Sequence, residues 1–323
     1  MARLRSWLGV VAIPEVTDPE PDGKSAEATE SESVAIVSGN ELDEEPEMEA
    51  VEASEEASAS LVSGVFNAGW ITNVGQVREH NEDGLFVFTA EQQSANAIPA
   101  FGLFVLADGM GGHQAGELAS ALAARVVAEY LLSQVYLPLL GGDERLSTQS
   151  PLTELMTEAV VAANRAVHRD LPDSGTTLTC GLIVGQRLFI GHVGDSRAYL
   201  WRATGEQRLL TTDHSMVNKL VEIGQLTLAE AAVHPQRNML YRAVGQGASL
   251  DVDVLTIPLY AGDQLLFCSD GLWGEVPEAE IWQLIAAADT PTAACIALEQ
   301  AANAVGGKDN ITAILVEMQE NLW

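Results

Sequence analysis

Apolar residues follow two different spacings along the chain from residue 65 onward. Short apolar runs, several rich in Val, Ile or Phe and bounded by Gly, Asp or Pro, are typical of β-strands. Such runs occupy residues 85–89, 101–107, 179–184, 188–193, 264–268 and 311–316. The pattern therefore predicts at least these six strands.

Longer segments repeat apolar residues at the spacing of an α-helix. The two long predicted helices are 115–135, with Leu118, Leu122, Val126 and Leu131 on the repeat, and 152–169, with Leu155, Ala159, Val160 and Val167. Shorter helices are predicted at 215–223, 227–233, 277–288 and 291–305, the last two opening near a proline.

The order of these elements bears on the fold class. Two predicted strands precede the first helices, more strands follow, and helices gather toward the end of the chain. Parallel βαβ proteins alternate strand and helix regularly, and this chain does not. The order instead predicts an α+β fold of antiparallel sheets with helices packed outside them.

Charge divides the chain of 323 residues, whose formal net charge is −30. Residues 13–59 hold 16 Asp and Glu against a single Lys. This composition buries too little apolar surface to offset the entropy of ordering, so residues 14–63 are predicted to be a disordered acidic tail. Residues 1–13 form a short basic and apolar segment, and 64–323 the folded domain. The tail is either a passive solvated segment or an autoinhibitory or partner-binding one.

Composition also excludes several classes of protein. A chain this acidic repels nucleic-acid backbones, and no run approaches the ~20 apolar residues of a membrane span. Residues 1–13 lack a small-x-small cleavage pattern, which favours a peripheral or docking segment over a signal peptide. The three cysteines lie in apolar runs without metal-site spacing, as expected of reduced thiols in a cytoplasmic protein.

Acidic residues recur where the predicted strands begin or end. Asp108, Asp195 and Asp270 follow apolar runs, Asp309 precedes the last strand, and Glu82-Asp83 opens the strand at 85. One such Asp is ordinary turn chemistry, but five cases in one chain suggest carboxylates that converge on cations. No pair of His residues has metal-ligand spacing. Oxygen donors without Cys or His select a hard cation such as Mg²⁺ or Mn²⁺.

The candidate substrate group is a phosphate. Arg78 stands four residues before Glu82, and a guanidinium beside a carboxylate-bound metal pair suits a bidentate phosphate contact. A plain salt bridge is the alternative reading of Arg78. The chain has no Gly-x-x-x-x-Gly-Lys-Ser/Thr loop, no Cys-x₅-Arg motif and no Gly-x-Ser-x-Gly elbow, so these other routes of phosphoryl or acyl chemistry are set aside.

Eight ordered segments resemble the metal-dependent serine/threonine protein phosphatases of the PPM (type 2C) class, in their bacterial form. They are NVGQVREHNED at 73–83, ADGMGGHQAGELAS at 107–120, GTTL at 175–178, HVGDSRAYL at 192–200, TDHS at 212–215, HPQR at 234–237, CSDGL at 268–272 and DNIT at 309–312. The resemblance runs from about residue 68 to 317 and leaves out the acidic tail.

The resemblance implies an α-β-β-α sandwich and hydrolysis of phosphoserine and phosphothreonine on proteins by a metal-activated water at a binuclear Mg or Mn centre. It assigns the metal ligands as Glu82, Asp83, Asp108, Gly109, Asp270 and Asp309, with Asp195 for a third, weaker ion. Arg78 and Asp108 are the implied catalytic residues, and Arg78 and His113 the implied substrate contacts. Residues 214–245 resemble the family's flap beside the active site.

This sequence departs from the family pattern at two positions. Gly274 stands where many members have an Asp that helps to hold the third metal, and Met110 stands where animal members have a His proposed as the acid. We expect phosphorylated proteins as partners, an opposing Ser/Thr kinase, a monomer and a cytoplasmic location. Two alternatives are a catalytically weak scaffold of the same fold that senses phosphoprotein or metal, and another metal phosphoesterase such as a nuclease.

Overall fold

The structure is a computed structural model that describes residues 57–62, 65–92, 98–111, 115–142 and 152–319, with 57–62 described by their main chain alone. The predicted basic segment 1–13 and residues 14–56 of the predicted acidic tail lie outside the described residues. So does His113.

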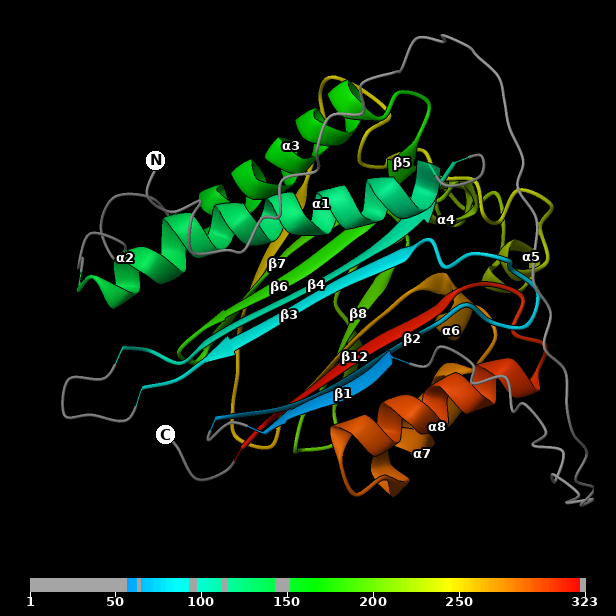
Figure 1. Ribbon diagram of the computed structural model, residues 1–323. Coiled ribbons are helices and arrows are strands. Elements are labelled where there is room, and N and C mark those ends of the chain that lie inside the picture. Colours follow the sequence, from blue (N-terminus) through cyan, green and yellow to red (C-terminus); the bar gives the residue numbers. More distant parts are fainter. Residues whose placement is uncertain (1–56, 63–64, 93–97, 112–114, 143–151, 320–323) are drawn as a thin grey trace, which may run out of the picture. The chain divides into compact units, whose positions relative to one another are not determined.

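Two antiparallel sheets form the centre of the domain (Figure 1). The first has the order β1 (Ala57–Val62), β2 (Phe66–Asn73), β12 (Ile311–Met318), β11 (Gln264–Cys268), β8 (Arg197–Trp201) and β9 (Gln207–Leu209). The second has the order β10 (Asp253–Pro258), β7 (Arg187–Val193), β6 (Leu178–Val184), β4 (Phe101–Met110) and β3 (Asp83–Ala90), and short β5 (Gly175–Thr176) pairs with β4.

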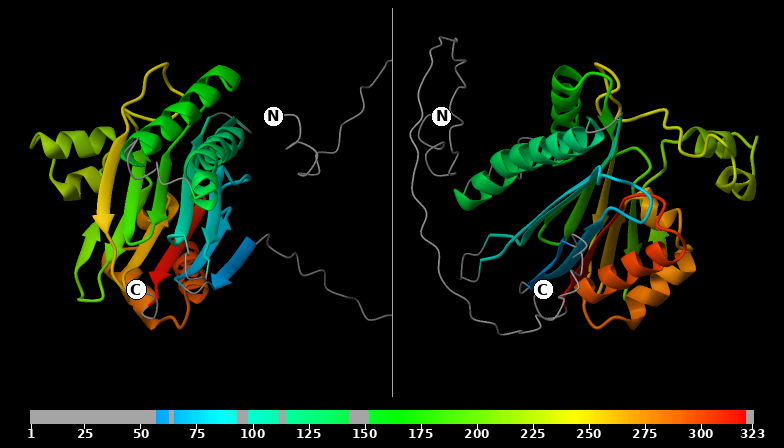
Figure 2. Two further views of the ribbon diagram at one scale, coloured as in Figure 1. Left: turned by 90° about the vertical axis from the view of Figure 1, so that its left-hand side faces the viewer. Right: turned by 45° about the vertical axis from the view of Figure 1, so that its right-hand side comes forward.

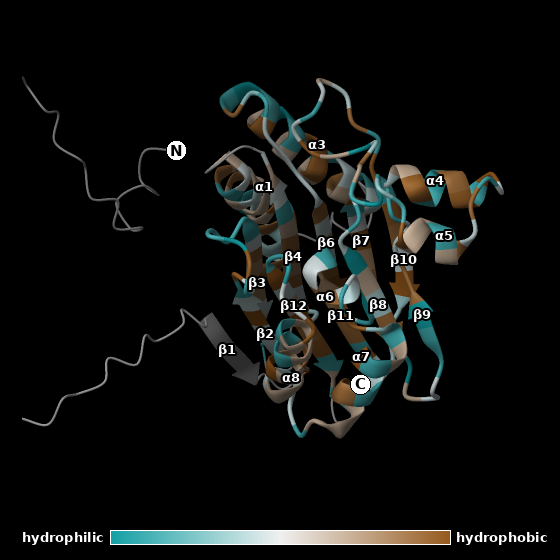
Figure 3. Ribbon diagram, turned by 90° about the vertical axis from the view of Figure 1, so that its right-hand side faces the viewer, coloured by the Kyte–Doolittle hydropathy of each residue, from teal (hydrophilic) through white to brown (hydrophobic). Residues whose placement is uncertain are grey.

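Helices cover the outer face of each sheet, as the side views show (Figure 2). On the second sheet lie α1 (Ala115–Leu131), the π-helical turn η1 (Leu132–Tyr136), α2 (Leu137–Leu140) and α3 (Leu152–Asp170). On the first sheet lie α7 (Glu278–Ala287) and α8 (Pro291–Ala304). Two short helices, α4 (Met216–Glu222) and α5 (Leu228–Ala232), stand apart from these layers, and α6 (Asp270–Trp273) follows β11 (Figure 3). The predicted α-β-β-α sandwich is confirmed.

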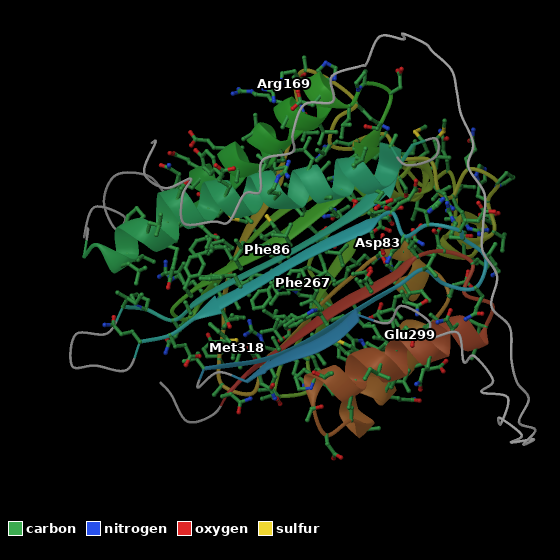
Figure 4. All side chains as sticks on the ribbon, in the orientation of Figure 1. Asp83, Phe86, Arg169, Phe267, Glu299 and Met318 are labelled. Carbon is green, nitrogen blue, oxygen red and sulfur yellow. The ribbon has the colours of Figure 1, made fainter. Side chains whose placement is uncertain are left out.

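Three apolar layers hold the sandwich together. Phe104 of β4 and Phe267 of β11 stack between the two sheets, with ring centroids 6.2 Å apart, and Figure 4 shows Phe267 in that layer. A second layer joins β4 and β6 to α1 and α3, and a third joins β11 and β12 to α7 and α8. Burial of these layers fixes the sheets rigidly, and their strand ends therefore have defined positions.

The face that α1 buries differs from the one predicted. Leu118 is 53% exposed, while Ala119, Ala123 and Val127 are fully buried. Small residues allow the helix axis to come close to β4 and α3, so the Ala-rich stripe packs inward and one large apolar side chain is left outside. By length and hydropathy alone, Ala115–Leu140 is long and apolar enough to cross a membrane, and 44% of its most apolar window is buried in the fold; a single helix of this kind is weak evidence for a membrane span.

The folded part begins earlier than predicted. β1 pairs with β2 in register from Ala57↔Thr72 to Val62↔Asn67, inside the segment 14–63 assigned to the disordered tail. An edge strand of small residues is held by main-chain hydrogen bonds, which composition does not register. The apolar runs also gave no prediction for β2, β8, β9 and β10. Half-buried positions interrupt the buried ones in β2, β8 has only three buried residues, β9 is exposed throughout, and β10 is mostly half-buried or exposed.

Candidate active site

Strands of both sheets bring carboxylates to one end of the sandwich. Asp83 opens β3 and lies directly opposite Asp108 near the end of β4. Asp270 follows β11, and Asp309 stands two residues before β12, the antiparallel neighbour of β11. Antiparallel neighbours place the end of one strand beside the start of the next, so separated sequence positions meet. Figure 4 shows Asp83 between the two sheets, toward the side of the domain that carries α6.

A hollow of about 200 Å³ gathers most of the predicted site residues. It is lined by Arg78, Glu82, Asp108, Gly109, Asp195, Asp270 and Asp309. Asp83 lies beside this hollow, across the β3–β4 pair from Asp108. All predicted site residues except His113, which is not among the described residues, therefore belong to one small region.

Asp83 provides the test of whether a cation fits here. Its Oδ2 accepts a hydrogen bond from Ser269 Oγ at 2.8 Å. Its Oδ1 is buried and has no hydrogen-bond partner among the described residues. A buried carboxylate oxygen without a partner is costly, and a hard cation or a water held by one would satisfy it.

The charges of the cluster point to the same conclusion. Burial raises the pKa of Asp83 to about 7, and the nearby Thr312 and the hydrogen bond from Ser269 act in the opposite direction. Burial and then the negative charge of Asp309 raise the pKa of Asp270 to about 6. For Asp108 and Asp195, burial and neighbouring carboxylates hold the pKa well above its usual range. Carboxylates packed in this way repel one another until positive charge arrives.

The oxygen donors suit Mg²⁺ or Mn²⁺ ions that keep some of their waters, and do not form a cage in which the protein supplies every ligand. Among the described residues, no three acidic, His or Cys side chains are arranged to enclose one ion. Mg²⁺ usually keeps several waters and takes only one or two carboxylates directly. The site therefore fits ions that share their coordination between carboxylates and water.

Arg78 contacts the carboxylate cluster directly. Its Nη2 donates to Asp309 Oδ2 at 2.6 Å, and the two side chains are 46% and 27% exposed. The second oxygen of Asp309, Oδ1, accepts from the Asn310 N–H at 2.9 Å. Both roles considered for Arg78 are compatible with this geometry. It makes a salt bridge with Asp309, and its half-exposed guanidinium lines the hollow, where it could contact a phosphate.

Asn310 holds the loop that carries Arg78 and Glu82, a role that the sequence reasoning missed. Its Oδ1 accepts from the Glu82 N–H at 2.8 Å, and its Nδ2 donates to the carbonyl oxygens of Val74 and His80 at 3.0 and 2.9 Å. The side chain is 4% exposed. Its position next to Asp309, in a turn before a buried strand, was the only available signal.

The main chain at Asp108 is fixed by two threonines that the sequence reasoning did not assign. Thr177 Oγ1 accepts from the Asp108 N–H at 2.8 Å, and Thr176 Oγ1 donates to the Asp108 carbonyl oxygen at 2.9 Å. The next residue has to be glycine, because a Cβ at Gly109 would lie 2.2 Å from the carbonyl oxygen of Gly116. A Cβ at Gly116, in the first turn of α1, would lie 2.7 Å from Glu82 Oε1, so the two glycines allow α1 to approach the end of β4 closely.

A stack of side chains supports Asp195 from the flap side of the hollow. Trp273 Nε1 donates to the Asp195 carbonyl oxygen at 3.0 Å, and the Arg197 guanidinium lies 3.5 Å from the centre of the Trp273 ring. Arg197 in turn donates to both oxygens of Asp213, at 3.0 and 2.7 Å. The stack links the root of the flap to α6, next to Asp270.

Comparison with known proteins identifies the family of the chain. Residues 77–304 match the family model described as protein phosphatase 2C. The serine/threonine phosphatase stp of Listeria innocua is 36% identical over 251 residues, which is 78% of this chain and 95% of that protein. Protein phosphatase PhpP of Streptococcus pneumoniae is 36% identical over 256 residues, or 77% of this chain and 96% of that protein.

Solved structures show the same fold. The serine/threonine phosphatase PstP/Ppp of Mycobacterium tuberculosis has a TM-score of 0.66 and 32% identity, covering 79% of this chain and 100% of that one. The catalytic domain of PstP in complex with two manganese ions has a TM-score of 0.64 and 32% identity, covering 79% of this chain and 99% of that one. The chain belongs to the protein phosphatase 2C family and is a metal-dependent serine/threonine protein phosphatase.

Proposed function

We propose that this chain hydrolyses phosphoserine and phosphothreonine on proteins at the carboxylate cluster between its two sheets. Asp108, Asp270 and Asp309 bind two divalent cations directly, together with the carbonyl oxygen of Gly109. Glu82 and Asp83 act mainly through water. The observation that carries this assignment is the buried, unpartnered Oδ1 of Asp83 among carboxylates whose pKa values are raised by burial.

The residues of the chain divide the chemical work between them. When bound, divalent cations supply a water of lowered pKa and positive charge for the phosphoryl oxygens. Arg78 releases Asp309 in part and binds the phosphate of the substrate, because its half-exposed guanidinium already lines the hollow. Asn310 fixes the loop that carries Arg78, so the phosphate meets a preformed site.

The finer identity of the cations is part of this proposal. We infer Mn²⁺ or Mg²⁺ at two positions, since all the donors are oxygen, and a third, weaker ion at Asp195. Gly274 supplies no side-chain ligand to that third ion. Asp195, whose pKa is raised by burial and by Asp270, is the carboxylate that we assign to this ion. His113 is a proposed contact for substrate or for water.

The surroundings of the enzyme are inferred from its chemistry and composition. Its partners are phosphorylated proteins, with a Ser/Thr kinase supplying the phosphate that it removes. We infer a cytoplasmic location, because the three buried free cysteines fit a reducing compartment. We also infer that the enzyme is a monomer. The acidic segment before β1 and the basic residues 1–13 are proposed to be dispensable for catalysis.

Substitution of the two aspartates that face each other across β3 and β4 tests the assignment. Asp108→Asn and Asp83→Asn keep the size of the side chain and remove its charge. With saturating Mn²⁺ we expect Asp108→Asn to lose p-nitrophenyl phosphate turnover by about 10³-fold or more, and Asp83→Asn by about 10- to 100-fold. EDTA should inactivate the unaltered chain reversibly. Near wild-type turnover of Asp108→Asn would overturn the site, and bound Mn²⁺ without turnover in the unaltered chain would favour a sensing scaffold.

A further inference from the structure

A second, larger cavity opens directly from the carboxylate hollow. Its volume is about 660 Å³, and it shares Arg78, Asp195, Asp270 and Asp309 with the hollow. From there it runs between the flap and the segment that follows α6. We call this cavity the flap groove. A group bound at the metal site therefore has a continuous path into the flap groove.

The outer part of the flap groove is apolar. Helices α4 and α5 contribute Val217, Val221, Leu228 and Ala231, and Trp273 lines the groove from α6. Leu228 is 76% exposed although it is a large aliphatic residue. Val221 is half-buried, and Val217 and Ala231 are buried. The exposed part of this apolar wall is the part that a ligand in the cavity would cover.

The groove has fixed walls on both sides. At the root of the flap, the Met216 N–H donates to the Met239 carbonyl oxygen at 2.7 Å, and the Tyr241 N–H donates to that of His214 at 2.9 Å. On the opposite side, the Arg197 guanidinium packs on the Trp273 ring and is held by Asp213. These contacts keep the apolar residues at a set distance from the metal site, so the groove is preformed.

The occupant of the groove follows from its connection to the active site. A phosphoserine or phosphothreonine whose phosphate lies at Arg78 must lead its polypeptide chain away from the hollow. A volume of about 660 Å³ accepts a few amino-acid residues, far more than the phosphate itself needs. Among the charged residues that line the groove, Arg197 is paired with Asp213 and Lys308 with Glu275, while Arg237 also lines it. The aliphatic residues of α4 and α5 are the part of the lining that can select an apolar side chain.

We propose that the flap groove is a specificity subsite that binds an aliphatic side chain of the phosphoprotein, one or two residues from the phosphorylated residue. This inference rests on the proposed function of the carboxylate site. Val221 and Leu228 contact the aliphatic side chain, and Trp273 closes the groove behind it. Substrates with a small or charged residue at that position bury less apolar surface and react more slowly.

The test uses the full chain with Mn²⁺ and a set of phosphothreonine peptides. Each pair of peptides differs at a single position, which carries either Leu or Ala. The positions tested are the first and second residues before phosphothreonine and the first and second residues after it. For the unaltered chain we expect Leu at one position to raise kcat/KM by roughly fivefold or more over Ala. Each rate is divided by the same protein's rate on p-nitrophenyl phosphate, which has no flanking residues.

Two flap variants show whether the groove causes this preference. Leu228→Ser, which alters the groove wall, should reduce the advantage of Leu to under about twofold. Val233→Ser is the matched control, because Val233 is 78% exposed on the same flap and does not line the groove. It should keep the full preference. Equal effects of the two variants would overturn the subsite.

The remaining outcomes separate the subsite from the catalytic assignment. Turnover of p-nitrophenyl phosphate without any preference among the peptides would overturn the subsite and leave the proposed function standing. Turnover of neither substrate would overturn both. Trp7→Ser in the full chain tests whether the chain's own apolar segment 1–13 occupies the groove. A rise in kcat/KM on all peptides alike would show that it does, and would refute the proposal.

Discussion

Removal of the Asn310 amide should release the loop that carries Arg78 and Glu82, because the hydrogen bonds that hold this loop beside the proposed metal site are lost. The amide makes three partly buried hydrogen bonds to main-chain groups, those of Glu82, Val74 and His80. At a net contribution of about 1 kcal/mol each, Asn310→Ala should lower the free energy of unfolding by about 3 kcal/mol. For a domain of this size, that loss corresponds to a fall in Tm of roughly 6–12 °C.

The same substitution should lower activity in the molecules that remain folded. Partners that orient the ligands of a metal site typically contribute 10- to 100-fold to metal affinity or activity, and we expect a loss of about that size in kcat/KM. Urea denaturation followed by tryptophan fluorescence gives the stability, and p-nitrophenyl phosphate turnover at saturating Mn²⁺, well below the Tm, gives the activity.

Asn73→Ala is the matched control for a local loss of stability. Asn73 Oδ1 accepts a single hydrogen bond in the same loop, from the Gly75 N–H at 2.7 Å. This variant should lose about 1 kcal/mol and keep most of its kcat/KM. If Asn310→Ala lost no more stability or activity than Asn73→Ala, the role assigned to the Asn310 amide would be refuted.

Three further predictions follow from the charges and boundaries of the domain. Arg78→Ala should cost about 1.5–3 kcal/mol in kcat/KM and shift the Mn²⁺ titration far less; an equal shift of both would make Arg78 a structural partner of Asp309. Without metal, Asp83 and Asp270 have pKa values of about 7 and 6, raised by burial, so their contribution to stability is present below about pH 4 and lost as the pH rises through these values. The Tm of EDTA-treated protein should therefore fall from pH 5 to pH 8, less so in Asp83→Asn, and Mn²⁺ should raise it most at pH 8; equal pH dependence in both proteins would contradict this. A chain that starts at Ala57 should keep kcat/KM on a phosphopeptide within about threefold at low and high salt, because domain and tail are both acidic, whereas a tenfold activation would show that the tail covers the site.

The fold could be predicted in outline because its buried strands read as continuous apolar runs. β4, β6, β7, β11 and β12 were found in this way. Short or weakly apolar strands were missed, since β1 depends on main-chain pairing, β8 has only three buried residues and β10 is mostly half-buried or exposed. The inward face of α1 was misjudged because alanine carries less weight than leucine in an apolar pattern, although close packing favours the smaller residue.

The charged residues of the candidate site could be predicted from the sequence, and its uncharged residues could not. Acidic residues at strand ends mark a cation site even without knowledge of which strands are neighbours. The residues that support it, such as Asn310, Thr177 and Trp273, carry no charge, and each is also common in turns or cores. Their roles depend on contacts between segments far apart in the sequence, as between Asn310 and His80, and only the folded chain brings these together.

The opposition of Asp83 and Asp108 on one sheet to Asp270 and Asp309 on the other has a consequence for how the enzyme matures. Neither sheet alone holds more than half of these four carboxylates. A newly made chain whose sheets have formed but not yet stacked carries every acidic residue of the site, yet has no place where they converge. On the proposed assignment, cation binding by all four carboxylates requires the two sheets to be packed as in the folded domain, so metal affinity reports on correct packing of one sheet against the other.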